Sequence, residues 1–230
     1  MNEDNIIKQL FKADGGPYSL STAMSARSGS GKTTLLSTLI SNASRSKGFE
    51  DQRFIYLSLK QENPFQDKTP VVSSVDEMLK ALRKNRIVVF YPPYPEEYES
   101  DVDDVIESVF DLAGNNPEAG FHLTIDDANI LRGFSNQGNP SGSVKKLAIA
   151  GRSKGIRALF ITHRLGNLPR LMNGNLSGLG LMSMNGSDSD YAKKVFGLDF
   201  TDLIAELGDF RWAVVDLVKE KTHRFEPVSV

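Results

Sequence analysis

Cysteine is absent from the 230-residue chain, which excludes disulfide bonds, a catalytic thiol and a cysteine-ligated zinc site. Its absence is compatible with a reducing compartment. Long hydrophobic runs are also lacking, since the longest span about five residues and a membrane-spanning helix needs about 20. The first five residues are polar and acidic, so we expect no secretory signal, no membrane span and a soluble protein.

The chain also lacks an excess of basic residues. Its 27 Lys and Arg against 29 Asp and Glu give a formal net charge of −2 and an isoelectric point of about 6.0. No basic field of the whole molecule therefore indicates nucleic-acid binding. This does not exclude DNA as a partner, because a ring-shaped motor can bind it through a few Lys and Arg on its pore loops.

Short apolar runs that alternate with helical patterns fill most of the sequence, and they indicate an α/β fold with a mostly parallel sheet. We expect strands at 18–25, 54–59, 86–91, 121–125, 156–161 and 179–184. We expect helices at 75–84, 102–113, 144–152, 188–196 and 200–207, and a hairpin of 211–217 with 222–225 at the sheet edge. No internal repeat or long linker divides the chain, so we expect one domain over 1–230 with its core at about 18–217.

Residues 26–33 read Ala-Arg-Ser-Gly-Ser-Gly-Lys-Thr, which fits the phosphate-binding loop with alanine in its first position, where glycine is commoner. The two glycines let the backbone curl so that successive N–H groups point at phosphate oxygens. Lys32 is placed to contact the β and γ phosphates, and Thr33 to offer its hydroxyl to Mg²⁺. A strand pattern precedes the loop and an apolar helical start follows it, as this anion site requires.

We therefore predict that the chain binds a nucleoside triphosphate together with Mg²⁺. The predicted nucleotide-binding residues are Ala26, Arg27, Ser28, Gly29, Ser30, Gly31, Lys32, Thr33 and Thr34. The alternative interpretation is a Gly- and Ser-rich surface loop that matches the motif by chance.

A second motif, Phe-His-Leu-Thr-Ile-Asp-Asp at 121–127, has the form of a Walker B strand. Its carboxylates follow the apolar residues at the carboxyl end, where ligands sit in an open parallel sheet. Asp126 is placed to hold Mg²⁺, and Asp127 to orient or deprotonate the attacking water. Taken by itself, such a pair is equally typical of a helix N-cap and its neighbour.

A third strand, at 158–161, delivers Thr-His-Arg to the same edge of the sheet. His163 is the candidate to contact the γ-phosphate or the catalytic water and to report hydrolysis to the rest of the molecule. The alternative is a histidine that closes the strand end and bonds to the backbone.

Together these segments resemble the FtsK–HerA branch of P-loop ATPases, and most of all the genome-packaging ATPases of membrane-containing, double-jelly-roll icosahedral viruses such as tectivirus-like phages. The resemblance covers roughly residues 18–215 and rests on the order of the phosphate loop, 91–93 (Tyr-Pro-Pro), 121–127, 151–156, 162–164 and 168–170 (Leu-Pro-Arg). It implies a P-loop NTPase (RecA/FtsK-like) fold with a mostly parallel central sheet flanked by helices and antiparallel strands at the C-terminal edge. It also implies ATP and Mg²⁺ as cofactors, and ATP hydrolysis that drives viral double-stranded DNA into a preformed capsid.

Two residues depart from the pattern of this family. Its second Walker B carboxylate is usually Glu, whereas Asp127 is one methylene shorter. Its sensor residue is usually Gln, whereas this chain has His163, which can still donate a hydrogen bond.

The resemblance also implies a homo-oligomeric ring, usually a hexamer, in which an arginine of one subunit completes the ATP site of the next. Arg152 matches the Gly-Arg that supplies this arginine in conjugation-type relatives, so it joins Lys32, Asp127 and His163 as a predicted catalytic residue. Arg164 and Arg170 are competitors for the same role, and each of the three is also consistent with a surface arginine in an ion pair.

DNA contact is expected through phosphates, on loops that face a central channel. The best candidate is the loop 132–146, with Arg132, Lys145 and Lys146, although a plain insertion between strand and helix fits it as well. The acidic run 96–104 has the pattern of a solvated face, which would suit docking to capsid vertex proteins. The expected location is the packaging vertex of the virion and the host cytoplasm.

Other functions fit parts of the sequence. A conjugative or mobile-element DNA pump would share the same motifs. A P-loop kinase would need an Arg-rich lid, and a GTPase-like switch would need an Asn-Lys-x-Asp segment, which this sequence lacks. A catalytically idle ATP-binding scaffold is favoured only by the shorter carboxylate at Asp127.

Overall fold

The computed structural model describes residues 22–27, 29–65, 69–116, 118–134, 138–182, 186–207, 211–217 and 221–225. Nine strands of these residues form one sheet in the order β3-β4-β2-β5-β6-β1-β7-β8-β9. The strands are β1 (Thr22–Ala26), β2 (Arg53–Ser58), β3 (Val71–Val72), β4 (Ile87–Phe90), β5 (Phe121–Asp126), β6 (Ile156–Thr162), β7 (Gly178–Met182), β8 (Trp212–Asp216) and β9 (Lys221–Phe225). The first seven pair in parallel, and β8 runs antiparallel to β7 and β9. The expected parallel sheet with antiparallel strands at its C-terminal edge is therefore confirmed.

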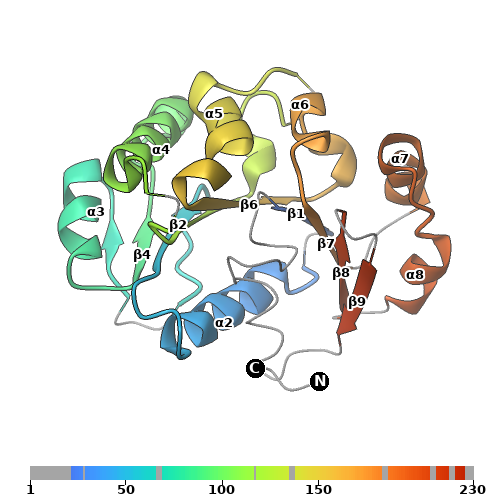
Figure 1. The fold of residues 1–230 in the computed structure, drawn as a ribbon. Helices are drawn as coiled ribbons and strands as arrows, with labels where there is room; N and C mark the ends of the chain where they lie inside the picture. The colour runs from blue at the N-terminus through green and yellow to red at the C-terminus, as the bar shows by residue number, and fades with distance from the viewer. Residues whose placement is uncertain are drawn as a thin grey trace.

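Helices cover both faces of this sheet (Figure 1). They are α2 (Lys32–Arg45), α3 (Val75–Leu82), α4 (Tyr98–Ala113), α5 (Gly142–Ala150), α6 (Arg170–Asn173), α7 (Gly186–Phe196) and α8 (Thr201–Glu206). Four short 3-10 helices, η1 (Pro95–Glu97), η2 (Ala128–Ile130), η3 (Arg152–Lys154) and η4 (Leu165–Asn167), lie in the connections. No helix in the described part of the chain is both long and apolar enough to span a bilayer.

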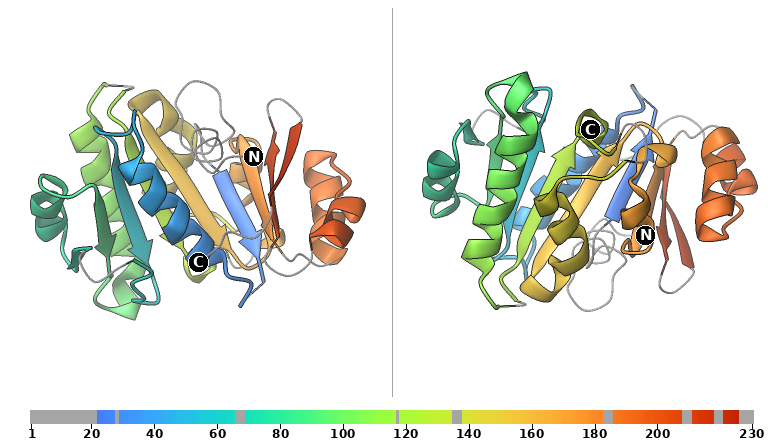
Figure 2. Two further views of the ribbon diagram at one scale, coloured as in Figure 1. Left: turned by 90° about the horizontal axis from the view of Figure 1, so that it is seen from below. Right: turned by 90° about the horizontal axis from the view of Figure 1, so that it is seen from above.

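Among the described helices, α2 lies against one face of the sheet, whereas α4, α5 and α6 cover the other (Figure 2). Strand β2 shows how the two layers share the sheet. Its Phe54 and Tyr56 belong to the hydrophobic cluster on the α2 side, and its Ile55 and Leu57 belong to the larger cluster that contains α4 and α5. Alternate residues point to opposite faces of a strand, so a parallel strand buried on both sides needs an apolar residue at nearly every position.

Most predicted elements are found with bounds that differ by a few residues, and the helix expected at 144–152 shows why. The helix expected at 144–152 begins two residues earlier, because the Ser141 side chain accepts a hydrogen bond from the backbone N–H of Val144. It ends at Ala150, since Gly151 accepts a bond from the Ile156 N–H and turns the chain toward β6. The first strand is described only from Thr22 and the seventh only to Met182, so the rest of those two expectations lies outside the described residues.

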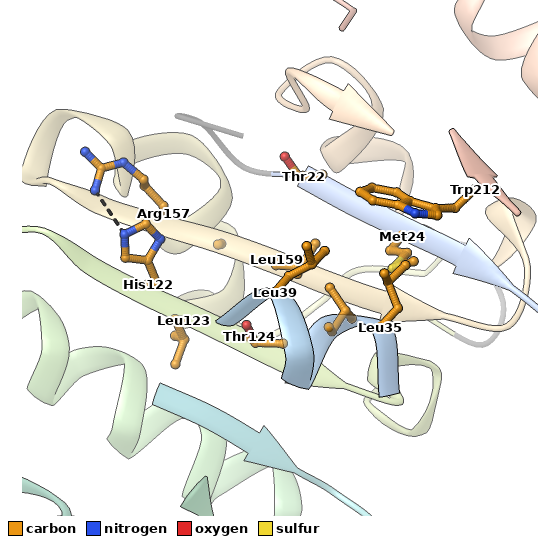
Figure 3. A pocket seen from close by; sticks show the side chains of 12 residues that line it. Thr22, Met24, Leu35, Leu39, His122, Leu123, Thr124, Arg157, Leu159 and Trp212 are labelled. Carbon is orange, nitrogen blue, oxygen red and sulfur yellow. Dashed lines mark hydrogen bonds between the residues drawn. The ribbon is translucent and has the colours of Figure 1, made fainter. Parts of the chain in front are cut away.

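A buried polar cluster lies at the amino ends of β5 and β6. His122 Nε2 is 2.6 Å from Gln52 Oε1, which also accepts a hydrogen bond from Arg157 at 3.0 Å. Figure 3 shows His122 and Arg157 beside an apolar cavity between α2 and the sheet, with Leu35, Leu39 and Trp212 along it. Burial is the main cause, and the Arg157 charge the second, of a His122 pKa well below its ordinary value.

We expect this buried histidine to make folding stability depend on pH. Below about pH 6.5 the unfolded chain takes up a proton at His122 that the folded chain resists, so the free energy of unfolding should fall on acidification. One such histidine contributes a slope of at most about 1.4 kcal/mol per pH unit. Urea unfolding at several pH values should show this slope, and it should be smaller in His122→Gln. An equal slope in both proteins would contradict the prediction.

Candidate nucleotide-binding site

The order of the strands brings the three predicted motifs to one edge of the sheet. Strand β6 pairs with β1 on one side and with β5 on the other, and all three run parallel. Their carboxyl ends therefore lie side by side, and each is followed by one motif: the phosphate loop after β1, Asp127 after β5 and His163 after β6. This confirms that the loop and the acidic strand end meet.

The phosphate loop has the backbone that the sequence predicts. Gly29 and Gly31 have φ angles of 77° and 81°, a left-handed conformation that residues with a Cβ rarely adopt. Gly31 caps α2 without a side-chain hydrogen bond, and the first turn of α2 carries no acidic residue. No side chain of the described residues therefore caps the first N–H groups of this helix, as the loop motif requires for binding an anion. Ser28 lies outside the described residues.

Lys32 and Thr33 open α2 and reach the end of β5. Alternation along β5 places Leu123 and Ile125 on the face of α4 and α5, so Asp126 falls on the α2 face. The Thr33 hydroxyl donates to Asp126 Oδ2 at 3.3 Å. The Tyr56 hydroxyl donates to the same oxygen at 2.5 Å. Burial of Tyr56 first, and then the Asp126 charge, hold the pKa of the phenol well above its ordinary value, so it remains a donor.

These atoms fit the Mg²⁺ and triphosphate that the motif implies. Hydroxyl and carboxylate oxygens are the ligands that Mg²⁺ prefers, and Thr33 and Asp126 supply both types. No group of three or more His, Asp or Glu suited to a metal occurs in the described residues, so phosphate oxygens and water would have to complete the coordination. The buried Ser30 Oγ in the loop has no hydrogen-bond partner among the described residues, which would suit a contact with a phosphate.

Burial is the main cause that raises the pKa of Asp126, and the hydrogen bond from Tyr56 opposes it. Lys32 lowers the same pKa from nearby, although more weakly. A divalent cation would act in the same direction as Lys32, because it favours the ionised carboxylate.

Asp127 lies beside Asp126 with both of its oxygens close to nitrogen atoms. Its backbone N–H donates to Asp126 Oδ1 at 2.9 Å. Its Oδ2 pairs with Lys60 Nζ at 2.8 Å, and its Oδ1 is 3.1 Å from His163 Nε2. Burial first, and then the Lys32 charge, lower the pKa of His163, so the ring is neutral near pH 7. Asp127 itself is almost fully buried.

Of the three candidate arginines, one precedes β6 and two follow it. Arg152 is exposed in η3, before β6 begins, and is therefore at the opposite end of the sheet from His163. It does not reach the site of its own chain. Arg164 directly follows His163, and Arg170 opens α6, and both are exposed.

The predicted DNA-contact residues differ in the exposure of their side chains and in their ion pairs. The Arg132 side chain is 83% exposed, with Glu99 Oε2 3.9 Å from its Nε. Lys145 is half-buried. Lys146 pairs with Glu107 and lies 4.4 Å from the centre of the Phe110 ring. The middle of this loop, 135–137, lies outside the described residues.

The chain after His163 is tied to α7. The Leu165 N–H donates to the buried Asp188 Oδ1 at 2.9 Å, which joins the segment after β6 to the first turn of that helix.

Sequence reasoning missed two residues of the site, Tyr56 and Lys60. Tyr56 occupies a core position of an apolar strand, where nothing in a single sequence separates a hydrogen-bonding tyrosine from a packing one. Lys60 comes two residues after β2 ends, and β2 pairs with β5 so that Ser58 lies opposite Asp126. A lysine directly after a strand was visible in the sequence. Its value as a sign of the site depends on knowing that this strand pairs with the Walker B strand.

We expect Tyr56→Phe to weaken Mg²⁺-dependent nucleotide binding, because the Asp126 oxygen loses the donor that orients it. The Mg²⁺ concentration for half-maximal binding of a fluorescent ATP analogue should rise about tenfold. Tyr94→Phe, at an exposed tyrosine, is the matched control and should leave it unchanged. Equal Mg²⁺ dependence in the two variants would show that the phenol does not orient Asp126.

No protein-family model matches the chain, and no curated protein matches its sequence. Among solved structures, it is similar to the genome packaging NTPase B204 from Sulfolobus turreted icosahedral virus 2 in complex with ATPγS, at 13% identity over 94% of this chain and 100% of that one, with a TM-score of 0.71. It is also similar to VirB4 of Thermoanaerobacter pseudethanolicus, at 9% identity over 96% of this chain and 92% of that one, with a TM-score of 0.61. The conjugation coupling protein TcpA of pCW3 matches at 13% identity over 91% of this chain and 60% of that one, with a TM-score of 0.55. The resemblance inferred from the motifs is thus confirmed at the level of the fold, and the chain has the P-loop NTPase fold of these structures.

Proposed function

We propose that the chain hydrolyses ATP and uses the energy to move viral double-stranded DNA into a preformed capsid. The observation that carries the hydrolysis is the contact of the phosphate loop with the acidic strand end, through Thr33 and Asp126, beside Asp127 and His163. The fold of a viral genome packaging NTPase over nearly the whole of both chains supports the packaging role.

Different residues of the site bind the phosphates, hold the metal ion and activate the water. The loop N–H groups and Lys32 bind the β and γ phosphates, and Thr33 and Asp126 would hold Mg²⁺. When bound, this ion neutralises charge that develops on the phosphate oxygens. Asp127 accepts a proton from the attacking water, and His163, neutral and adjacent, donates a hydrogen bond to the water or the γ-phosphate.

The position of Arg152 supports a ring of identical subunits. An exposed arginine at the amino edge of the sheet is remote from its own nucleotide site, so it can complete only the site of a neighbour. Such a contact joins unlike surfaces of two copies, and repeated contacts of that kind form a ring when the rotation between neighbouring copies closes. We propose a hexamer that acts at the packaging vertex of the virion and in the host cytoplasm, in contact with capsid vertex proteins. Arg132 is its best placed candidate for DNA contact, because its side chain is 83% exposed although Glu99 lies 3.9 Å away, whereas Lys146 pairs closely with Glu107.

A conjugative or mobile-element DNA pump is the second candidate. It is favoured by the likeness to the conjugation coupling protein TcpA, which is weaker than the likeness to B204. It differs from the first candidate in its partners and not in the chemistry of the site.

We expect ATP hydrolysis that double-stranded DNA stimulates and that Lys32→Ala reduces by two to three orders of magnitude, since the lysine stabilises charge on the transferred phosphoryl group. Lys47→Ala, at an exposed lysine beyond α2, is the control and should hydrolyse ATP normally. Phosphate release with and without DNA measures both effects. Hydrolysis indifferent to DNA would contradict translocation, and transfer of phosphate to a small metabolite would indicate a kinase.

A mixture of two inactive variants tests the ring. Subunits with Arg152→Ala keep an intact Asp127, and subunits with Asp127→Asn keep the arginine. If Arg152 serves the neighbouring site, mixing should restore part of the activity, because some interfaces then combine an intact arginine with an intact base. No recovery at any ratio would place the arginine elsewhere, and Arg164→Ala would then be mixed in the same way.

A further inference from the structure

We infer that Lys60 is a positioning residue that holds Asp127 by one carboxylate oxygen and leaves the other to accept the proton of the attacking water. The inference rests on the proposed hydrolysis of ATP and deepens it, since it assigns different tasks to the two oxygens of one side chain. Three features of the described residues carry it: an ion pair, two strained backbone positions and a buried oxygen without a hydrogen bond.

The ion pair joins the ends of two neighbouring strands. Lys60 follows β2 and Asp127 follows β5, and Lys60 Nζ lies 2.8 Å from Asp127 Oδ2. The Asp127 side chain is only 8% exposed, whereas that of Lys60 is 44% exposed. A buried carboxylate needs a partner, and the hydrogen bond to Asp127 is the main cause that raises the pKa of Lys60. The lysine therefore stays charged and in place.

The backbone on both sides of this pair is held in an unusual conformation. Gln61 and Asp127 have φ angles of 57° and 53°, and in the described part of the chain they are the two residues other than glycine with positive φ. Such a conformation costs energy and persists only where surrounding contacts fix it. The Gln61 side chain donates to the Pro92 carbonyl at 2.9 Å, and the Glu62 N–H donates to Ser58 Oγ at 3.0 Å. These bonds fix the turn that carries Lys60.

The second oxygen of Asp127 is differently placed. Oδ1 is buried, and none of the described residues gives it a hydrogen bond of good geometry. His163 Nε2 lies 3.1 Å away, close enough to share a ligand with this oxygen. A water between Oδ1 and the γ-phosphate would have an acceptor for its proton on one side and the neutral imidazole beside it.

The reaction then uses only this oxygen. The water oxygen forms a bond to the γ-phosphorus while one water proton passes to Asp127 Oδ1, and the bond from that phosphorus to the oxygen it shares with ADP breaks. Lys60 touches neither the water nor the nucleotide. It limits rotation of the carboxylate, so that Oδ1 keeps its direction, and a short aspartate in place of glutamate depends on that direction more because it reaches less far.

The inference is tested with Lys60→Met, which removes the charge and keeps much of the length, and Lys60→Arg, which keeps the charge. We expect kcat for ATP to fall at least about tenfold in Lys60→Met and to recover most of its value in Lys60→Arg. The dissociation constant of a fluorescent ATP analogue should change less than about threefold in both, because Lys60 does not touch the nucleotide. Lys193→Met is the matched control, since Lys193 forms an exposed ion pair of 2.7 Å with Asp199 outside the site.

A double variant shows whether Lys60 acts through Asp127. If it does, adding Lys60→Met to Asp127→Asn should slow hydrolysis no further, because the side chain that Lys60 positions has already lost its function. An unchanged kcat in Lys60→Met, a loss confined to nucleotide affinity, or an equal loss in the Asp127→Asn background would each overturn the inference. Absence of hydrolysis in the unmodified protein would instead overturn the proposed function, and the role of Lys60 with it.

Discussion

The hydrogen bond between Thr33 and Asp126 is the contact on which the rest of the site depends. It joins two residues 93 positions apart in the sequence, at the start of α2 and the end of β5, although β6 lies between their strands. It is possible because α2 crosses the sheet on the same face to which Asp126 points. The bond places a carboxylate that can hold a cation beside a loop that binds anions, and the pairing of β1, β5 and β6 adds Asp127 and His163.

Burial of the two neighbouring carboxylates of Asp126 and Asp127 costs free energy. Two nearly buried aspartates stand side by side, and buried carboxylates need polar or charged partners. Tyr56, Thr33 and Lys32 provide it for Asp126, and Lys60 provides it for Asp127. The tyrosine comes from the core of β2 and the lysine from the turn after it, so one strand supports both carboxylates.

The sequence predicted the parallel sheet and the meeting of Lys32, Thr33, Asp126, Asp127 and His163, because phosphate loops and acidic strand ends have strict local requirements. It did not predict Tyr56, because a hydrogen-bonding tyrosine and a packing tyrosine fit the same apolar pattern. Nor could it predict the pairing of Lys146 with Glu107, which depends on how α5 packs beside α4. Lys60 was missed because strand order, which places β2 next to β5, is a property of the whole fold.

The bond from the Leu165 N–H to Asp188 has a consequence at the far edge of the sheet. Leu165 comes two residues after His163, and Asp188 lies in the first turn of α7, on the side of the antiparallel strands. This hydrogen bond therefore joins the segment after β6 to the start of α7, although about 20 residues separate them along the chain. A displacement of His163 at the γ-phosphate would therefore be expected to shift α7 as well.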